Sequence, residues 1–182
     1  MADCLVVTLE DGASRAVRHI WHDLGRRFGV SRAHAEAEPH LTLAVITGRP
    51  DRAVLEDRIR QLVATVPVFP VTSAGFGVFL GSDRVPVVHL AVTRTPRLDA
   101  LHAGVLQAVG ASGAGTDGES APEFWRPHVN LADQNLDAET VGRVMACLVT
   151  SGPRHWTAEI TNVTLLTAAG PGGFTVALEG TG

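Results

Sequence analysis

The sequence predicts one domain of mixed helices and strands, arranged as two similar lobes that face each other across a cleft. Three observations support this fold class. The chain has 182 residues, which is enough for one core of ordinary size. Its apolar residues alternate several times between strand spacing and helix spacing. Its two halves correspond at an offset near 88 residues, and a repeat of this length suggests two lobes related by a pseudo-twofold axis.

The first half of the repeat contains four strands and two helices. The expected elements are strand 5–9, helix 14–28, strand 41–46, a helix from 50 to about 66, and strands 68–80 and 87–93, joined by a turn at 81–83. Apolar residues three or four positions apart predict the first helix, namely Val17, Ile20, Trp21 and Leu24. Pro50 and Asp51 are typical of a helix start and predict the second helix.

The second half follows the same order. The expected elements are helix 98–109, strand 127–132, helix 137–149, and strands 156–167 and 174–178, joined by residues 168–173. The stretch 110–122 is rich in Gly, Ala, Ser and Thr, so we expect a mobile loop there. A tolerated surface insertion is the simpler interpretation, and a lid over the cleft is the alternative.

Composition excludes several functional classes. Nineteen acidic and fifteen basic residues give a net charge of -4, which argues against nonspecific binding of DNA or other long nucleic acid. A small anionic ligand stays possible. All the basic residues are Arg, so a Schiff-base lysine and the lysine of a phosphate-binding P-loop are both excluded.

The cellular setting is predicted from the cysteines and the N-terminus. Cys4 and Cys147 are too few and too far apart for a disulfide framework or a cysteine-rich zinc site, so we expect a reducing cytoplasm. The first residues lack the basic lead and apolar stretch of a signal peptide. No apolar run reaches the ~18 residues of a membrane span. We therefore expect a soluble cytoplasmic protein with no membrane partner.

One six-residue motif occurs twice, at equivalent positions of the repeat. Residues 39–44 read Pro-His-Leu-Thr-Leu-Ala and residues 127–132 read Pro-His-Val-Asn-Leu-Ala, identical at four of six positions. Alternate residues of a strand share a face, so His40 and Thr42 point one way, as do His128 and Asn130. If the lobes pair as the repeat implies, the two imidazoles and two hydrogen-bonding side chains converge on one cleft.

This set of side chains suits in-line attack on a phosphodiester. A neutral imidazole takes a proton from the nucleophile, and an imidazolium protonates the leaving oxygen. Such chemistry needs no metal or other cofactor. The Thr42 hydroxyl and the Asn130 amide would donate to the non-bridging oxygens, where charge grows in the transition state.

The chain resembles the two-histidine phosphoesterase superfamily, which includes bacterial 2′-5′ RNA ligase-like proteins and 2′,3′-cyclic nucleotide phosphodiesterases. The resemblance rests on the two His-x-Thr/Ser-type motifs, on residues 75–79 before the strand ending at 87–90, and on the closing strand at 163–166. It implies a bilobal α+β fold, each lobe with an antiparallel sheet and two helices, and no metal. It also implies a 2′,3′-cyclic phosphate or 2′-5′ phosphodiester substrate.

Two residues depart from the family pattern. Asn130 stands where relatives have Thr or Ser, and its amide is longer than a hydroxyl and would move the phosphate. Asp133 stands where relatives often carry a basic residue, and its carboxylate would repel a polyanion.

Four further residues are candidates for substrate binding. Arg126 could clamp a phosphate oxygen, or could be an ordinary solvated arginine. Phe79 and His89 occupy positions where the family often has aromatic residues near the cleft, and either could stack on a base. For Phe79 a core position is the simpler interpretation, whereas His89 is favoured as a cleft residue. Trp125 could stack at the edge of a lid, although we favour a hydrophobic anchor.

These observations predict a monomeric, metal-independent phosphodiesterase. Its expected substrate is a nucleotide or short RNA with a 2′,3′-cyclic phosphate, and His40 and His128 are the catalytic acid and base in an undecided order. Cleavage of a cyclic or 2′-5′-linked oligonucleotide, or 2′-5′ ligation of RNA, is the alternative within the same fold. From another class, Asn130 and Asp133 suggest a nucleotide- or phosphate-binding module with weakened catalysis.

Overall fold

The predicted order of strands and helices is present in a computed structural model, which describes residues 2–32, 38–81, 84–151, 155–168 and 173–179. Its elements are β1 (Cys4–Thr8), α1 (Asp11–Phe28), β2 (His40–Thr47), α2 (Arg52–Val63), β3 (Phe69–Leu80), β4 (Pro86–Val92), α3 (Pro96–Ala111), β5 (Gly115–Thr116), η1 (Gly118–Ser120), β6 (His128–Ala132), α4 (Ala138–Ser151), β7 (Thr157–Ile160), β8 (Asn162–Leu166) and β9 (Thr175–Ala177). Most of the predicted turns at 81–83 and 168–173 lies outside the described residues.

The helices begin and end where capping groups satisfy their backbone. The carboxylate of Glu10 accepts hydrogen bonds from the amides of Gly12 and Ala13, so α1 starts at Asp11, three residues before its predicted start. Its end matches the prediction, because Gly29 adopts φ 68° and closes the last turn.

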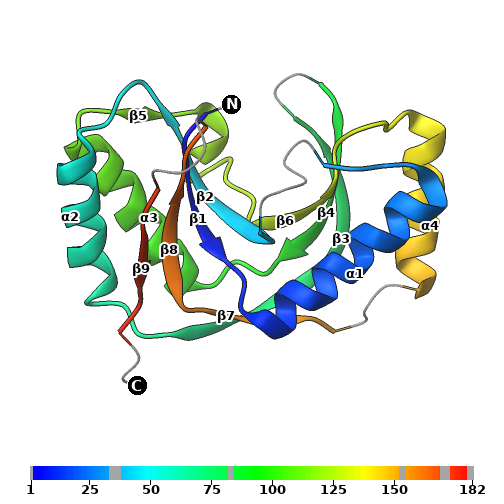
Figure 1. Cartoon of the computed structure of the whole chain (residues 1–182), viewed down its shortest axis with the longest axis horizontal. Coiled ribbons are helices and arrows are strands. Elements are labelled where there is room, and N and C mark those ends of the chain that lie inside the picture. Colours follow the sequence, from blue (N-terminus) through cyan, green and yellow to red (C-terminus); the bar gives the residue numbers. More distant parts are fainter. Residues whose placement is uncertain (1, 33–37, 82–83, 152–154, 169–172, 180–182) are drawn as a thin grey trace.

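The strands follow one continuous path, in the order β7-β3-β4-β6-β2-β1-β8-β9. All neighbours are antiparallel, and β2 and β6 meet in the middle, where Leu41 pairs with Val129. Helices α2 and α3 pack beside β2, β8 and β9, whereas α1 and α4 pack beside β6, β7, β3 and β4 (Figure 1). The predicted α+β fold, with an antiparallel sheet and two helices in each lobe, is therefore confirmed.

Each lobe takes elements from both halves of the chain. The lobe around β2 contains β1 and α2 from the first half and α3, β8 and β9 from the second. The lobe around β6 contains α1, β3 and β4 from the first half and α4 and β7 from the second. The two motif strands thus lie side by side at the centre of an interleaved structure (Figure 1).

The single strand predicted at 156–167 is wrong, because the structure divides it at Thr161 into β7 and β8. Strand β7 pairs with β3 in one lobe, and β8 pairs with β1 in the other. Buried residues occur on both sides of the break, including Ile160 and Val163. Hydrophobic periodicity therefore continues through the point at which the chain passes from one lobe to the other.

The mobile loop predicted at 110–122 is also wrong. Helix α3 extends to Ala111, β5 pairs with β2, and η1 follows. The amide of Asp117 donates to the carbonyl of Val45 at 3.1 Å, and the amide of Val45 donates to Oγ of Ser120 at 3.0 Å. At Gly115 the segment lies close against β2, because a Cβ on this residue would approach Oγ1 of Thr47 to 2.9 Å.

The core lies between the sheet and the helices. Leu41 and Leu43 of β2 and Val129 and Leu131 of β6 are almost fully buried and alternate with half-buried polar residues. The central strands therefore bury their aliphatic face and leave His40, Thr42, His128 and Asn130 on the other. In the described part of the chain, every helix is too short or too polar to cross a membrane.

Candidate active site on the central strands

The two motif histidines lie on one face of the central strand pair. Leu41 pairs with Val129, so continuing this antiparallel register places His40 opposite Asn130 and Thr42 opposite His128. The four polar side chains then form a square in which the two histidines are diagonal neighbours, about 7–8 Å apart at the backbone. The charge of His40 also acts on the pKa of His128, which agrees with this placement.

Both histidines are held by the same local hydrogen bond. Nδ1 of His40 lies 2.7 Å from the carbonyl oxygen of Glu38, and Nδ1 of His128 lies 2.6 Å from that of Arg126. A carbonyl only accepts, so Nδ1 is the donor in each ring and Nε2 is the nitrogen that can gain or lose a proton. The intervening Pro39 and Pro127 fix the short backbone segment that each bond spans.

His128 lies in a more restricted environment than an ordinary surface histidine. Burial lowers its pKa from 6.5 to about 4; the Arg126 carbonyl opposes this shift, and the charges of His89, His40 and Arg126 add to it. Its ring contacts Phe79 and His89 edge-on, with centroids at 4.9 Å and 5.4 Å. His128 is therefore neutral at pH 7 in the absence of ligand.

Thr42 and Asn130, two residues after the motif histidines, are also supported alike. The indole N–H of Trp125 donates to the backbone carbonyl of Thr42 at 3.0 Å, and that of Trp21 donates to the carbonyl of Asn130 at 2.8 Å. Trp125 precedes β6 and Trp21 belongs to α1, so each tryptophan anchors a strand distant in sequence. These bonds fix the backbone from which Thr42 and Asn130 project.

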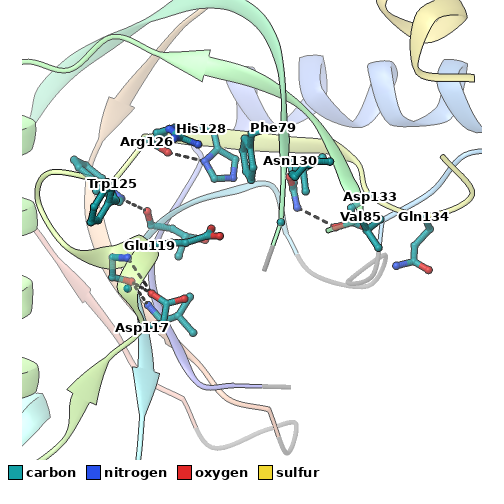
Figure 2. Close-up of a pocket in the computed structure, with 18 residues that line it drawn as sticks. Phe79, Val85, Asp117, Glu119, Trp125, Arg126, His128, Asn130, Asp133 and Gln134 are labelled. Carbon is teal, nitrogen blue, oxygen red and sulfur yellow. Dashed lines mark hydrogen bonds between the residues drawn. The ribbon is translucent and has the colours of Figure 1, made fainter. Parts of the chain in front are cut away.

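Asn130 and Asp133, the two departures from the family pattern, are bonded to each other. Nδ2 of Asn130 donates to Oδ2 of Asp133 at 3.0 Å (Figure 2). Arg32, nearly buried, lies 3.1 Å from the ring centroid of Trp21, and the charge of Asp133 counters the lowering of its pKa by burial. The Asp133 carboxylate therefore has a cationic neighbour, which reduces the repulsion expected between this carboxylate and a phosphate.

A cavity of about 860 Å³ opens over this face of the sheet. Figure 2 shows Asp117, Glu119 and Trp125 on one side, Asn130, Asp133 and Gln134 on the other, and Arg126, His128 and Phe79 between them. Thr42 also lines the cavity, whereas His40 and His89 are absent from its lining in the described part of the chain. Three of the four motif side chains therefore face one space large enough for a nucleotide.

The four predicted substrate-binding residues have different surroundings. Arg126 is exposed at the cavity, and its guanidinium carbon lies 6.0 Å from the ring centroid of Phe79, which is half-buried. Trp125 lines the cavity but is only 5% exposed, and it stacks on His102 at a centroid distance of 3.8 Å. His89 is 8% exposed and packs against His128, so it offers little surface to a ligand.

The sequence analysis missed several residues of the cavity wall, among them Phe124, Leu80 and Glu119. Phe124 is 60% exposed and Leu80 is 56% exposed, although both are large and apolar. Glu119 lies in the stretch that had been interpreted as a loop. The Phe124-Trp125 pair before the second motif was the available signal: the burial of Trp125 agrees with the favoured interpretation as a hydrophobic anchor, whereas nothing in the sequence indicated an exposed Phe124.

The backbone around Phe124 is held from several sides. The guanidinium of Arg94 donates to the carbonyls of Pro122 and Trp125, and the amide of Phe124 donates to the carbonyl of Ala121. Arg94 itself is paired with Asp99 at 2.8 Å. The exposed phenyl group therefore projects from a fixed segment.

Metal ligation finds no support in the described side chains. Among them, no group of three or more His, Cys, Asp and Glu residues is placed to hold a metal ion. What the site does contain is two histidines with defined proton-exchanging nitrogens beside hydroxyl and amide donors. This arrangement can carry out acid-base chemistry on a bound phosphate ester.

Comparison with solved structures identifies the same fold. The structure of Escherichia coli LigT complexed with 3′-AMP superposes with a TM-score of 0.60 at 18% identity, covering 98% of this chain and 95% of that one. TT0787 of Thermus thermophilus gives 0.60 at 19% identity, with 98% and 96% covered. Kluyveromyces marxianus Usb1 gives 0.53 at 14% identity, with 97% of each chain covered.

The family assignment comes from the sequence. A search of curated proteins finds no match. The family model of the 2′-5′ RNA ligase superfamily, however, matches residues 9–172, a span that includes both motifs and nearly every element of the fold. The chain therefore belongs to the 2′-5′ RNA ligase superfamily, a group of two-histidine phosphoesterases.

Proposed function

We propose that this protein is a phosphodiesterase that opens the 2′,3′-cyclic phosphate of a nucleotide or short RNA end, using His40 and His128 as acid and base without a metal. The observation that carries the proposal is the matched pair of histidines. Both stand on the central strands, both direct Nδ1 to the carbonyl two residues earlier, and both lie on the face that bears the cavity.

The burial of His128 supports an assignment of roles. Burial lowers the pKa of His128 to about 4, so its Nε2 is unprotonated at pH 7 and can accept a proton from water. As water loses that proton, its oxygen bonds to phosphorus and one bond from phosphorus to a ribose oxygen breaks. His40 protonates the departing oxygen, which leaves a phosphomonoester beside a free hydroxyl.

The charge that grows on the phosphate oxygens needs nearby hydrogen-bond donors. Thr42 offers a hydroxyl next to His128, and Arg126 offers an exposed guanidinium at the same cavity. One Nδ2 hydrogen of Asn130 is used by Asp133, which leaves the second for the substrate. The fixed backbones of Thr42 and Asn130 favour stabilisation without reorganisation.

The cavity wall supports a substrate with an organic part as well as a phosphate. Phe124 presents a phenyl face on a fixed segment, and Leu80 adds an exposed apolar side chain to the same wall. A nucleobase can stack on such a ring. Asp117, Glu119 and Asp133 also line the cavity, and their carboxylates favour one short anionic substrate over a long polyanion.

The test is hydrolysis of 2′,3′-cyclic nucleotides in the presence of a chelator. The wild-type protein should release the phosphomonoester, and H40A and H128A should each lower kcat about 10²- to 10⁴-fold. H19A, which changes an exposed histidine of α1, is the matched control and should keep full activity. Unchanged turnover in both H40A and H128A would refute the mechanism.

Ligation and cleavage of 2′-5′ linkages use the same groups. Incubation with a panel of cyclic, 2′-5′-linked and 3′-5′-linked oligonucleotides, followed by mass analysis of the products, separates these reactions from cyclic phosphate hydrolysis.

A binding module with weakened catalysis is the second candidate, because the Asn130–Asp133 hydrogen bond takes up part of the amide that should meet the phosphate. Calorimetry on the wild type distinguishes the two functions. Tight nucleotide binding without turnover, together with activity gained in N130T, would favour the binding module. Turnover by the wild type that changes only a few-fold in N130T supports the enzyme.

A further inference from the structure

We infer that His89 is a positioning residue, whose imidazole holds the ring of His128 in place and keeps water from it, so that His128 meets the phosphodiester as a neutral base. This inference rests on the proposed function for its catalytic meaning. The contact between the two rings is a property of the fold and can be measured without any substrate.

Three rings pack together beneath the cavity. His89 and His128 are in edge contact at 5.4 Å, Phe79 lies 4.9 Å from His128, and Phe79 lies 5.0 Å from His89. His128 thus has two aromatic neighbours, His89 from β4, which pairs with β6, and Phe79 from β3, which pairs with β4. These contacts restrict rotation of its ring, as an efficient proton acceptor requires.

The position of His89 in the sheet is specific to one lobe. His89 pairs with Asn130 across β4 and β6, so it lies on the same face of the sheet as Asn130 and His128. At the corresponding place beside the other motif, Val6 pairs with Thr42 across β1 and β2. A buried valine is sufficient to fill that place in one lobe, whereas the other lobe has an imidazole there, beside the histidine that would act as base.

The sequence leaves room for this imidazole. Gly77 pairs with His89 across β3 and β4, and a Cβ on Gly77 would lie 2.7 Å from both Cε1 and Nε2 of the His89 ring. Any other residue at 77 would displace the ring. Nδ1 of His89 lies 3.4 Å from the carbonyl of Val87, a longer version of the bond that orients the two motif histidines.

The charged and titratable groups around His128 are consistent with this role. They are His40 from β2, His89 from β4 and Arg126 from the preceding segment, and all three lower its pKa. Burial also lowers the pKa of His89, so this ring is itself neutral at pH 7. At pH 7 its contribution is therefore enclosure and orientation, because its charge opposes protonation of His128 only at the lower pH at which His89 is itself protonated.

The experiment follows the His128 Cε1–H signal by NMR during a pH titration of the intact protein, with the signal assigned from H128A. In H89A, water should reach His128 and its pKa should rise by at least about 1 pH unit. G77A should produce a shift in the same direction by displacing His89 without altering it. H89F keeps a ring of similar size and should leave the pKa within about 0.5 unit of wild type.

The matched control is G142A on α4, where a Cβ meets no atom within 4 Å. The acid limb of the kcat/KM profile should move with the titration in H89A and G77A, while KM changes less than kcat. If the His128 pKa is unchanged in both variants, the inference is wrong. If it shifts but the wild type hydrolyses no cyclic phosphate, the ring contact stands and only the proposed function fails.

Discussion

The first motif, on β2, and the second, on β6, share a backbone design but differ in their neighbours. In each, the histidine bonds the carbonyl two residues earlier, and a tryptophan indole bonds the carbonyl two residues later. The differences lie beside these bonds: Thr42 is replaced by Asn130, and the neighbouring strand carries Val6 in one lobe and His89 in the other. A repeated motif can thus supply two identical groups, and under the proposed function their different surroundings assign one as the acid and the other as the base.

The largest effect on activity is expected from substitution of the two histidines, tested by H40A, H128A and the double variant H40A/H128A. If the two histidines act on one phosphodiester as a pair, kcat should fall about 10³-fold in either single variant and little further in the double variant. Single-turnover hydrolysis of a 2′,3′-cyclic nucleotide measures all three. A double variant whose loss is the product of the two single losses would show that the histidines act independently.

Substitution of Thr42 should give the next largest effect. T42V removes the hydroxyl that would stabilise the transition state, and kcat should fall about 10²-fold with a small change in KM. T42S keeps the hydroxyl and should stay within a few-fold of wild type. Equal activity of T42V and T42S in steady-state assays would exclude Thr42 from the reaction.

Stability should depend on pH because burial lowers the pKa of His128, and of His89 and His102, in the folded state. The unfolded chain binds more protons below pH 6.5, so the neutral rings stabilise the fold above that pH. Their contribution is lost as the pH falls toward 4. Allowing for partial solvent exposure, the free energy of unfolding should fall by about 2 kcal/mol over this range. Urea unfolding at fixed ionic strength measures it, and a pH-independent free energy would contradict these shifts.

The indole hydrogen bonds of Trp21 and Trp125 should contribute similar amounts to the free energy of unfolding. W21F and W125F each remove one N–H···O bond to a motif carbonyl, and each should lower the free energy of unfolding by about 1.5 kcal/mol in urea titrations. W156F is the matched control, because its buried indole nitrogen has no hydrogen-bond partner among the described residues. A loss in W156F equal to that in the other two would assign the effect to ring volume instead.

The smallest effect concerns Phe124. F124A should raise KM for a cyclic nucleotide about fivefold and leave kcat unchanged, since stacking holds the base but does not reach the phosphate. V149A changes another exposed apolar residue, on α4, and should leave KM unaltered. An unchanged KM in F124A would remove this phenyl group from the binding site.

Much of the central site could be predicted because it depends on local rules. Strand alternation places His40 with Thr42 and His128 with Asn130, and the pairing of β2 with β6 puts both pairs on a shared face. The surroundings of these residues could not be predicted in the same way. Phe124 is exposed and Trp125 buried because of contacts with Arg94, His102 and Thr42, which lie far away in sequence.

The errors have the same origin. The apolar run 156–167 forms two strands because its two parts pair in different lobes. The Gly-rich stretch 110–122 forms part of the cavity wall because β5 pairs with the end of β2, at Ile46 and Thr47. Single-sequence patterns report which face of an element is buried, but not which distant segment buries it.

The interleaving of the two lobes has a consequence for folding. A polypeptide that ends after β4 would carry β1 and β2 without β8 and β9, and β3 without β7, leaving apolar edges in both lobes unpaired. Neither half is thus an autonomous folding unit. The lobes should unfold in a single cooperative transition, and assembly should be slow because β8 must find β1 across most of the polypeptide.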